Sequence, residues 1–205
     1  MSSVIDLRAY VDPSRAPTLV LIDMQQEYVA SPRFLAFSDA SRAIENCRAA
    51  LAHAQTIGVP VAFVRWVGRS SYFNSATRFS RWIDGFEPTG VDMVFERSHP
   101  SCYASAQFAE VMSASGGNFV FAGFAGEAAC LSTAIDAFHR GHHFTYLADA
   151  SASHALDGVA ADEMHEVMTK VIGLYGDVTA TQSWIAITSQ RKKMGSRSNA
   201  KLDEL

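Results

Sequence analysis

The chain has 205 residues, of which 48% are hydrophobic and 19% charged, and its net charge is −4. This length and balance indicate one globular domain with a sizeable core, and they exclude disorder over most of the chain. The weak negative charge gives no support for nucleic acid or an anionic membrane as a partner. No apolar run approaches the roughly 18 residues of a membrane span.

The first half of the chain contains two predicted strands and one predicted helix. Residues 18–22 (TLVLI) form a continuous apolar run that ends at Asp23, which is typical of a buried strand. Residues 39–58 carry Cys47 and Leu51 at helical spacing, and Gly58 can end this helix. Residues 59–67 predict the second strand. Residues 68–90 are irregular and rich in arginine and aromatic residues, and we expect these exposed rings to line a pocket or form a subunit contact.

The second half continues the alternation of strands and helices. The patterns predict strands at residues 92–95, 118–124, 143–147 and 177–179, and helices at residues 104–115, 128–140 and 160–174. Two-residue hairpin signals are nearly absent. The alternation therefore predicts an α/β protein, a three-layer α/β/α fold around a mostly parallel six-stranded sheet. We expect one domain over residues 1–189 and a loose polar tail over residues 190–205.

The cysteines, histidines and N-terminal residues suggest a cytoplasmic protein without a cofactor. Three cysteines without a CxxC pair argue against a disulfide framework and a structural zinc site. The histidines form no HExxH pattern, and there is no glycine-rich phosphate loop, so we expect neither a metal nor a cofactor. We also expect no signal peptide, because no basic region followed by an apolar stretch opens the chain.

Residues with useful chemistry follow three of the predicted strands. Ligands of an open parallel sheet bind beyond the carboxyl ends of its strands, where Asp23, Arg97 and the segment from Glu127 to Cys130 are expected. A partly desolvated Asp23 suits acid–base chemistry, and Arg97 can supply charge and binding but no proton. A helix N-terminus can activate the Cys130 thiol. The structural alternatives are a turn aspartate, a surface arginine and a core cysteine.

Four motifs in this order resemble the isochorismatase-like hydrolases, or cysteine hydrolase superfamily: LVLIDMQQEY, RSHPSCYASAQF, GFAGEAACLSTAIDAF and DASASH. The resemblance covers residues 18–184 and implies the same parallel-sheet fold, a small-molecule substrate and a homodimer or homotetramer. Amidase members of the family use an aspartate after the first strand, a lysine after the third and a cysteine at the helix after the fourth. The aspartate corresponds to Asp23.

Two positions depart from the family pattern. Counting back from Ser101-Cys102-Tyr103 places Arg97 where the family has lysine, and counting back from Thr133 places Ala129 at the nucleophile position, one residue before Cys130. The metal-binding Asp/His pair of nicotinamidases is also missing, which argues against that activity.

Three interpretations remain open. In the first, Cys130 is the nucleophile of an amidohydrolase that forms an acyl-enzyme, with the N–H groups of Ala129 and Cys130 holding the oxyanion. In the second, as in isochorismatases proper, Asp23 acts without a thiol on an amide or enol ether of a small carboxylate-bearing molecule. In the third, Ala129 is an engineered replacement of the nucleophile, or the chain is a catalytically silent binder of a small molecule. We expect substrate contacts from Gln25, Tyr28, Trp66, Cys102, Tyr103 and Glu127.

Overall fold

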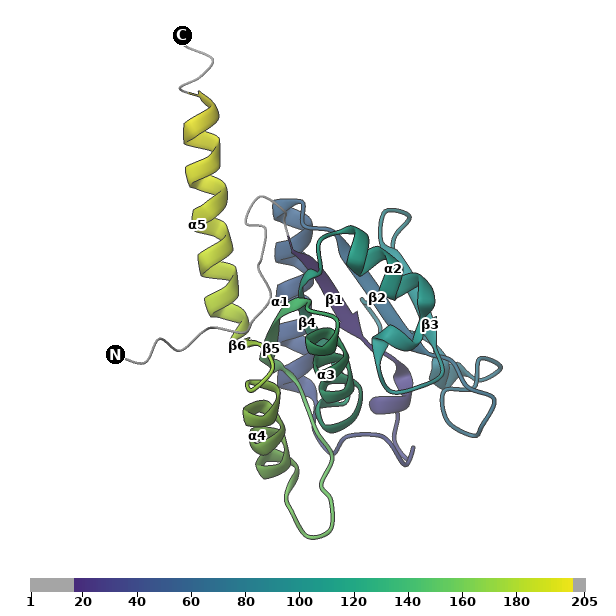
Figure 1. Ribbon diagram of the computed structural model, residues 1–205. Helices are drawn as coiled ribbons and strands as arrows, with labels where there is room; N and C mark the ends of the chain where they lie inside the picture. Colours follow the sequence, from purple (N-terminus) through teal and green to yellow (C-terminus); the bar gives the residue numbers. More distant parts are fainter. Residues whose placement is uncertain (1–16, 201–205) are drawn as a thin grey trace.

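A single parallel sheet organises the chain in the computed structural model, which describes residues 17–200, the last ten as backbone only (Figure 1). Its strands are β1 (Thr18–Ile22), β2 (Val61–Trp66), β3 (Met93–Arg97), β4 (Asn118–Gly123), β5 (His143–Ser151) and β6 (Asp177–Thr179). Their order is β3-β2-β1-β4-β5-β6, and every neighbouring pair is parallel. The predicted α/β fold with a parallel six-stranded sheet is therefore confirmed.

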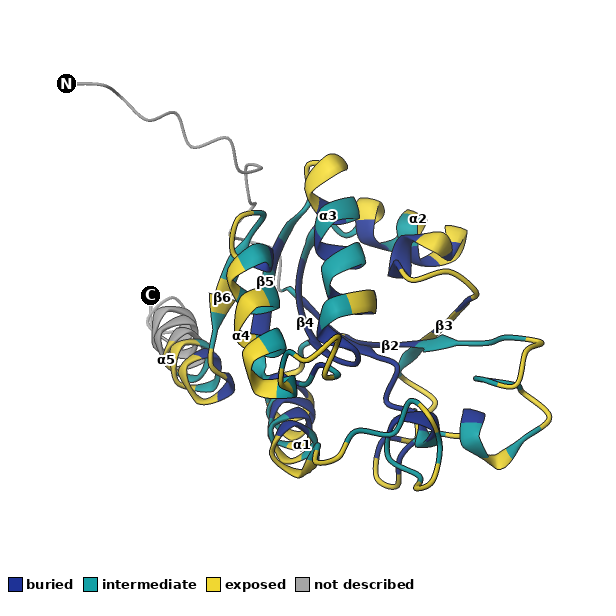
Figure 2. Cartoon of the chain, turned by 90° about the horizontal axis from the view of Figure 1, so that it is seen from below, coloured by how far each residue is buried: buried dark blue, intermediate teal, exposed yellow. Residues whose placement is uncertain are grey.

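Helices cover both faces of the sheet (Figure 2). The helices are α1 (Ser41–Ile57), α2 (Ala106–Ala114), α3 (Leu131–His139), α4 (Ala161–Ile172) and α5 (Thr181–Ala200). Side chains of α1 and the start of α5 pack into one apolar core, and those of α2, α3 and α4 pack into the other. Within residues 17–200, no helix combines the length and apolar composition needed to cross a bilayer.

The central strand β1 serves both cores at once. Leu19 and Leu21 belong to the α1 side, Val20 and Ile22 belong to the α2–α3 side, and all four are inaccessible to solvent. Successive strand residues point to opposite faces, so a strand covered on both sides is apolar throughout. This explains why TLVLI has no polar alternation although it lies in a sheet.

Strands β1 and β4 approach each other closely at their carboxyl ends. Gly123 pairs with Ile22, and its φ of 116° lies in the left-handed region. A Cβ atom at this position would lie 2.0 Å from the Ile22 carbonyl oxygen. The absence of a side chain at Gly123 thus brings the segment after β4 beside Asp23, which follows β1.

The structure departs from the predicted elements in several places. The helix expected from residue 128 begins at Leu131, after a wide helical turn, η4 (Gly126–Cys130), in which the Cys130 N–H donates to the Ala125 carbonyl at 3.1 Å. Strand β5 extends four residues beyond its predicted end, to Ser151. Helix α5 was not predicted. It begins at Thr181 and continues to Ala200, into the region where an irregular tail was expected, and residues 1–16 and 201–205 lie outside the described part.

Candidate active site

Asp23 and Arg97 form a buried ion pair across the carboxyl ends of β1 and β3. The Arg97 Nη2 donates to Asp23 Oδ2 at 2.5 Å, and both side chains are fully inaccessible. Arg97 also donates from Nη1 to the His99 carbonyl at 2.6 Å and lies over the Trp66 ring, 4.8 Å from its centre. The sequence predicted that these two residues lie at the same edge of the sheet. Strand β2 lies between β1 and β3, and the Arg97 side chain reaches Asp23 across its end.

Burial dominates the electrostatics of this pair. It raises the pKa of Asp23 to about 6, although the Arg97 charge opposes the shift. A carboxyl group with such a pKa can both hold and release a proton near neutral pH. Asp23 Oδ1 and Arg97 Nε have no hydrogen-bond partner among the described residues. Among the described residues, the buried pair thus has one unused acceptor and one unused donor.

Cys130 has the surroundings of a core cysteine. Its thiol is wholly buried and lies 3.5 Å from the Gly123 carbonyl and 3.7 Å from the Ser151 hydroxyl. Burial raises its pKa well above the ordinary value. The Cys130 N–H, expected to hold an oxyanion, is already bound to Ala125. The preceding Ala129, at the family's nucleophile position, is buried and presents a methyl group.

The other predicted site residues have different surroundings. Gln25 is a structural link, because its amide donates to the Trp66 and Ser80 carbonyls at 3.0 Å each and accepts from the Trp66 N–H at 2.9 Å. The Tyr103 hydroxyl lies 2.7 Å from His142 Nδ1, toward the surface beyond α3. Cys102 stays at the site. Burial raises its pKa to about 11, while nearby Arg97 lowers it.

An aromatic cluster borders the Asp23 side of the site. Tyr28 packs against Phe37, Phe73 and Phe124 with ring centres 5.3–5.7 Å apart. Burial raises the pKa of Tyr28 well above its usual value, and the Asp23 charge adds to this shift. The Tyr28 hydroxyl is therefore within reach of the charges of the ion pair.

Glu127 and His154 form a contact that the sequence analysis did not predict. The His154 Nδ1 lies 2.6 Å from Glu127 Oε1, and its Nε2 lies 3.0 Å from the Leu35 carbonyl. His154 also stacks on Phe37 at 4.3 Å between ring centres. The histidine lies in the DASASH motif, but no spacing rule joins it to a glutamate in a different loop.

The irregular segment after β2 differs from its prediction in one respect. We expected its aromatic residues to be exposed, but Phe73 is buried and Trp66, Tyr72, Phe79 and Trp82 are partly buried. Phe34, in a different loop, is instead highly exposed, at 80%. Loop packing against the apolar core under α1 explains this difference.

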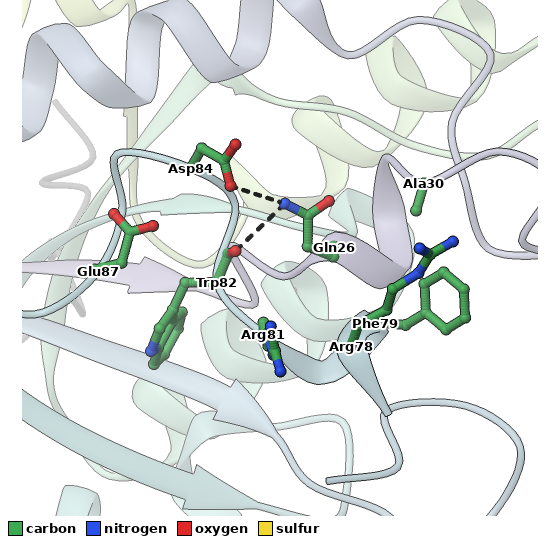
Figure 3. A pocket seen from close by; sticks show the side chains of 8 residues that line it. All are labelled: Gln26, Ala30, Arg78, Phe79, Arg81, Trp82, Asp84 and Glu87. Carbon is green, nitrogen blue, oxygen red and sulfur yellow. Dashed lines mark hydrogen bonds between the residues drawn. The ribbon is translucent and has the colours of Figure 1, made fainter. Parts of the chain in front are cut away.

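A surface cavity of about 570 Å³ opens between this segment and the short helix η1 (Gln26–Tyr28) (Figure 3). Its lining consists of Gln26, Ala30, Arg78, Phe79, Arg81, Trp82, Asp84 and Glu87. None of the predicted catalytic residues is in this lining. Within the described residues, no cluster of three or more His, Cys, Asp or Glu side chains could hold a metal ion.

Comparison with known proteins assigns the family. A family model described as the isochorismatase domain matches residues 17–183. The chain belongs to the isochorismatase family. This membership makes it a hydrolase, and it confirms the resemblance seen in the sequence. No protein of curated function matches the chain significantly.

Solved structures share the fold of this isochorismatase-family hydrolase. An isochorismatase from Pseudomonas putida KT2440 is 25% identical, with a TM-score of 0.77 over 85% of this chain and 93% of the other. A cysteine hydrolase from Pseudomonas syringae pv. phaseolicola 1448A is 17% identical, with a TM-score of 0.79 over 89% and 97%. The N-carbamoylsarcosine amidase from Thermoplasma acidophilum is 22% identical, with a TM-score of 0.67 over 81% and 96%.

Proposed function

We propose that this hydrolase cleaves a small carboxylate-bearing molecule by acid–base chemistry at Asp23, without a thiol nucleophile. The observation that carries the proposal is the buried Asp23 carboxyl group, whose pKa burial raises to about 6. The surroundings of Cys130 support the same interpretation, because a buried thiol with a raised pKa is a poor nucleophile. The scissile bond is an enol ether or an amide C–N bond.

In this mechanism Asp23 transfers protons and Arg97 supplies positive charge. Protonated Asp23 donates its proton to the enol-ether carbon, or to the leaving nitrogen of an amide, and water completes the hydrolysis. Arg97 cannot give up a proton, so it acts through its charge. Its Nε donor, which has no partner among residues 17–190, is available to a substrate carboxylate.

Turnover by matched variants tests this proposal. The assay offers a 2-alkoxyacrylate, which is a carboxylate-bearing vinyl ether, and an N-carbamoyl amino acid, and follows product formation by mass spectrometry. We expect the wild-type chain and Cys130→Ser to hydrolyse one of them, and Asp23→Asn to lose about 10²–10⁴-fold in rate. Activity in Asp23→Asn together with loss in Cys130→Ser would instead establish the thiol route. Absence of wild-type turnover on both compounds would favour a silent binder.

We further propose that the chain forms a homodimer or homotetramer. Family resemblance implies this, and the 80% exposed Phe34, whose ring centre lies 6.1 Å from that of Tyr72, supports it. Light scattering after size exclusion gives the mass directly. A monomer at micromolar concentration would contradict the proposal.

A further inference from the structure

Glu127 is a second carboxyl group at the same end of the sheet as Asp23. It is the second residue of η4, just beyond β4, and β4 pairs with β1 up to the Ile22–Gly123 contact. Asp23 and Glu127 also share neighbours, because the charges of both raise the pKa values of the Tyr28 hydroxyl and the Cys130 thiol. The two carboxyl groups therefore follow neighbouring strand ends and act on the same two side chains.

The two oxygen atoms of Glu127 have different surroundings. Oε1 accepts the hydrogen bond from His154 Nδ1 at 2.6 Å, which fixes the side chain. Oε2 is inaccessible to solvent and has no hydrogen-bond partner among the described residues. A buried acceptor without a partner is unfavourable unless something binds it, so Oε2 is an acceptor suited to a ligand or a water molecule.

His154 keeps Glu127 ionised. Both of its ring nitrogens face acceptors, Glu127 Oε1 and the Leu35 carbonyl, and only the imidazolium form donates from both nitrogens. Burial is the largest single effect on both groups, and it raises the pKa of Glu127 and lowers that of His154. Their mutual hydrogen bond and charge attraction, added to contributions from Ser153 and the backbone for Glu127 and from the Leu35 carbonyl for His154, together outweigh burial. The pKa of Glu127 is therefore lowered and that of His154 is raised. The other polar groups near Glu127 are Ser153, Tyr28 and the Cys130 thiol.

The pKa values of the two carboxyl groups are thus shifted in opposite directions. Asp23 holds its proton up to a pH of about 6, whereas Glu127 releases its proton below the usual range. Two carboxyl groups whose environments separate their pKa values in this way are the usual pattern of an acid–base pair. The neutral group is suited to donate a proton, and the ionised group is suited to accept one.

We propose that Glu127 is a second catalytic residue of this hydrolase, whose free Oε2 deprotonates the attacking water while Asp23 protonates the substrate. The inference rests on the proposed function and adds the base that it lacks. His154 is a positioning residue, because it acts through Glu127.

The proton transfers balance for both candidate bonds. In an enol ether, Asp23 protonates the terminal carbon, water adds to the resulting cation and gives a proton to Glu127, and a hemiketal forms. Its C–O bond to the alcohol breaks as Glu127 protonates the leaving oxygen, and the hemiketal hydroxyl returns a proton to Asp23. In an amide, Glu127 takes the proton of the attacking water, Asp23 protonates the leaving nitrogen, and solvent returns the proton from Glu127 to Asp23.

The experiment compares Glu127→Gln with a matched control, Glu163→Gln, which changes an exposed glutamate on α4. The substrate is whichever of the 2-alkoxyacrylate and the N-carbamoyl amino acid the wild type hydrolyses. Glutamine still accepts the His154 hydrogen bond, so the fold should be retained. We expect a loss of about 10²–10⁴-fold in kcat for Glu127→Gln and none for the control.

Two readouts separate catalysis from a structural effect. The wild-type rate should fall at low pH as Glu127 takes up a proton, and this acidic limb should vanish in Glu127→Gln. His154→Gln should move the limb to higher pH, because it removes the cation that lowers the Glu127 pKa. Azide, a nucleophile that needs no deprotonation, should partly restore turnover in Glu127→Ala.

The possible failures are distinguishable. If the wild type hydrolyses a substrate and Asp23→Asn does not, but Glu127→Gln keeps its rate and its acidic limb, the role of Glu127 is refuted and the proposed function stands. If the wild type hydrolyses neither compound, or Asp23→Asn remains active, the proposed function is refuted and the acid–base pair with it.

Discussion

Replacing Arg97 by methionine would remove one partner of the fully buried ion pair and leave the Asp23 carboxylate without a counter-charge. With Arg97 present, the pKa of Asp23 rises from 3.8 to about 6, which already corresponds to a penalty of about 3 kcal/mol on the charged form. Without Arg97 this penalty grows. We expect Arg97→Met to reduce the free energy of unfolding at pH 8 by about 3–5 kcal/mol.

The loss should depend on pH, and its sign follows from linkage. The folded chain binds the Asp23 proton more tightly than the unfolded chain does, so the free energy of unfolding falls as pH rises from about 4 through 6. At pH 5 the carboxyl group is mostly neutral, and Arg97→Met should then cost about 1–2 kcal/mol, as for a lost hydrogen bond. At pH 8 the full charge penalty applies.

Urea unfolding followed by circular dichroism at pH 5 and pH 8 measures both values. Arg81→Met is a suitable control, because Arg81 is exposed, and it should be nearly neutral at both pH values. A cycle with Asp23→Asn isolates the interaction between the two side chains. Equal losses at pH 5 and pH 8, or a loss that Asp23→Asn does not relieve, would refute the assigned electrostatics.

Three further changes probe other parts of the structure. Gly123→Ala should cost about 3 kcal/mol or more in unfolding free energy, because the new Cβ would meet the Ile22 carbonyl at 2.0 Å; a melting temperature close to that of the wild type would contradict this. Cys130 should resist a thiol reagent in the native state and react after urea denaturation, since burial both shields the thiol and raises its pKa. Fast labelling of the native protein would instead support Cys130 as the nucleophile. His154→Gln should lose stability mostly at acidic pH. The raised pKa of His154 stabilises the fold fully below a pH of about 6.5, and this stabilisation disappears as pH rises through the folded-state pKa. A loss of melting temperature that grows with pH would contradict a charged His154 in the folded chain.

The strands were predictable because burial on both faces makes their sequences continuously apolar, as in residues 18–22 and 118–123. Their common direction follows from the alternation with helices, and this places Asp23 and Arg97 at the same edge of the sheet. The ends of the elements were less predictable. Gly123 allows β4 to pass closely beside β1, and the wide turn after it delays α3 to Leu131.

The charged residues of the site were predictable from the sequence, but most of their hydrogen-bond partners were not. Gln25 and Tyr103 carry groups typical of a binding site, yet tertiary hydrogen bonds occupy the Gln25 amide and direct the Tyr103 hydroxyl to His142. The Glu127–His154 pair joins the ends of β4 and β5, 27 residues apart, and no periodicity encodes it. Which oxygen of Glu127 remains unpaired depends on packing, so it could not be inferred from sequence.

The burial of Asp23 and Arg97 has a consequence for the timing of catalysis. Because neither side chain is accessible to solvent, a reactant can contact them only after the surrounding residues move. His154 contacts the segment before α1 through a hydrogen bond with the Leu35 carbonyl and a stacked Phe37 ring. If these two contacts must break before a reactant can bind, turnover should slow in viscous solvents even where the chemical step is fast.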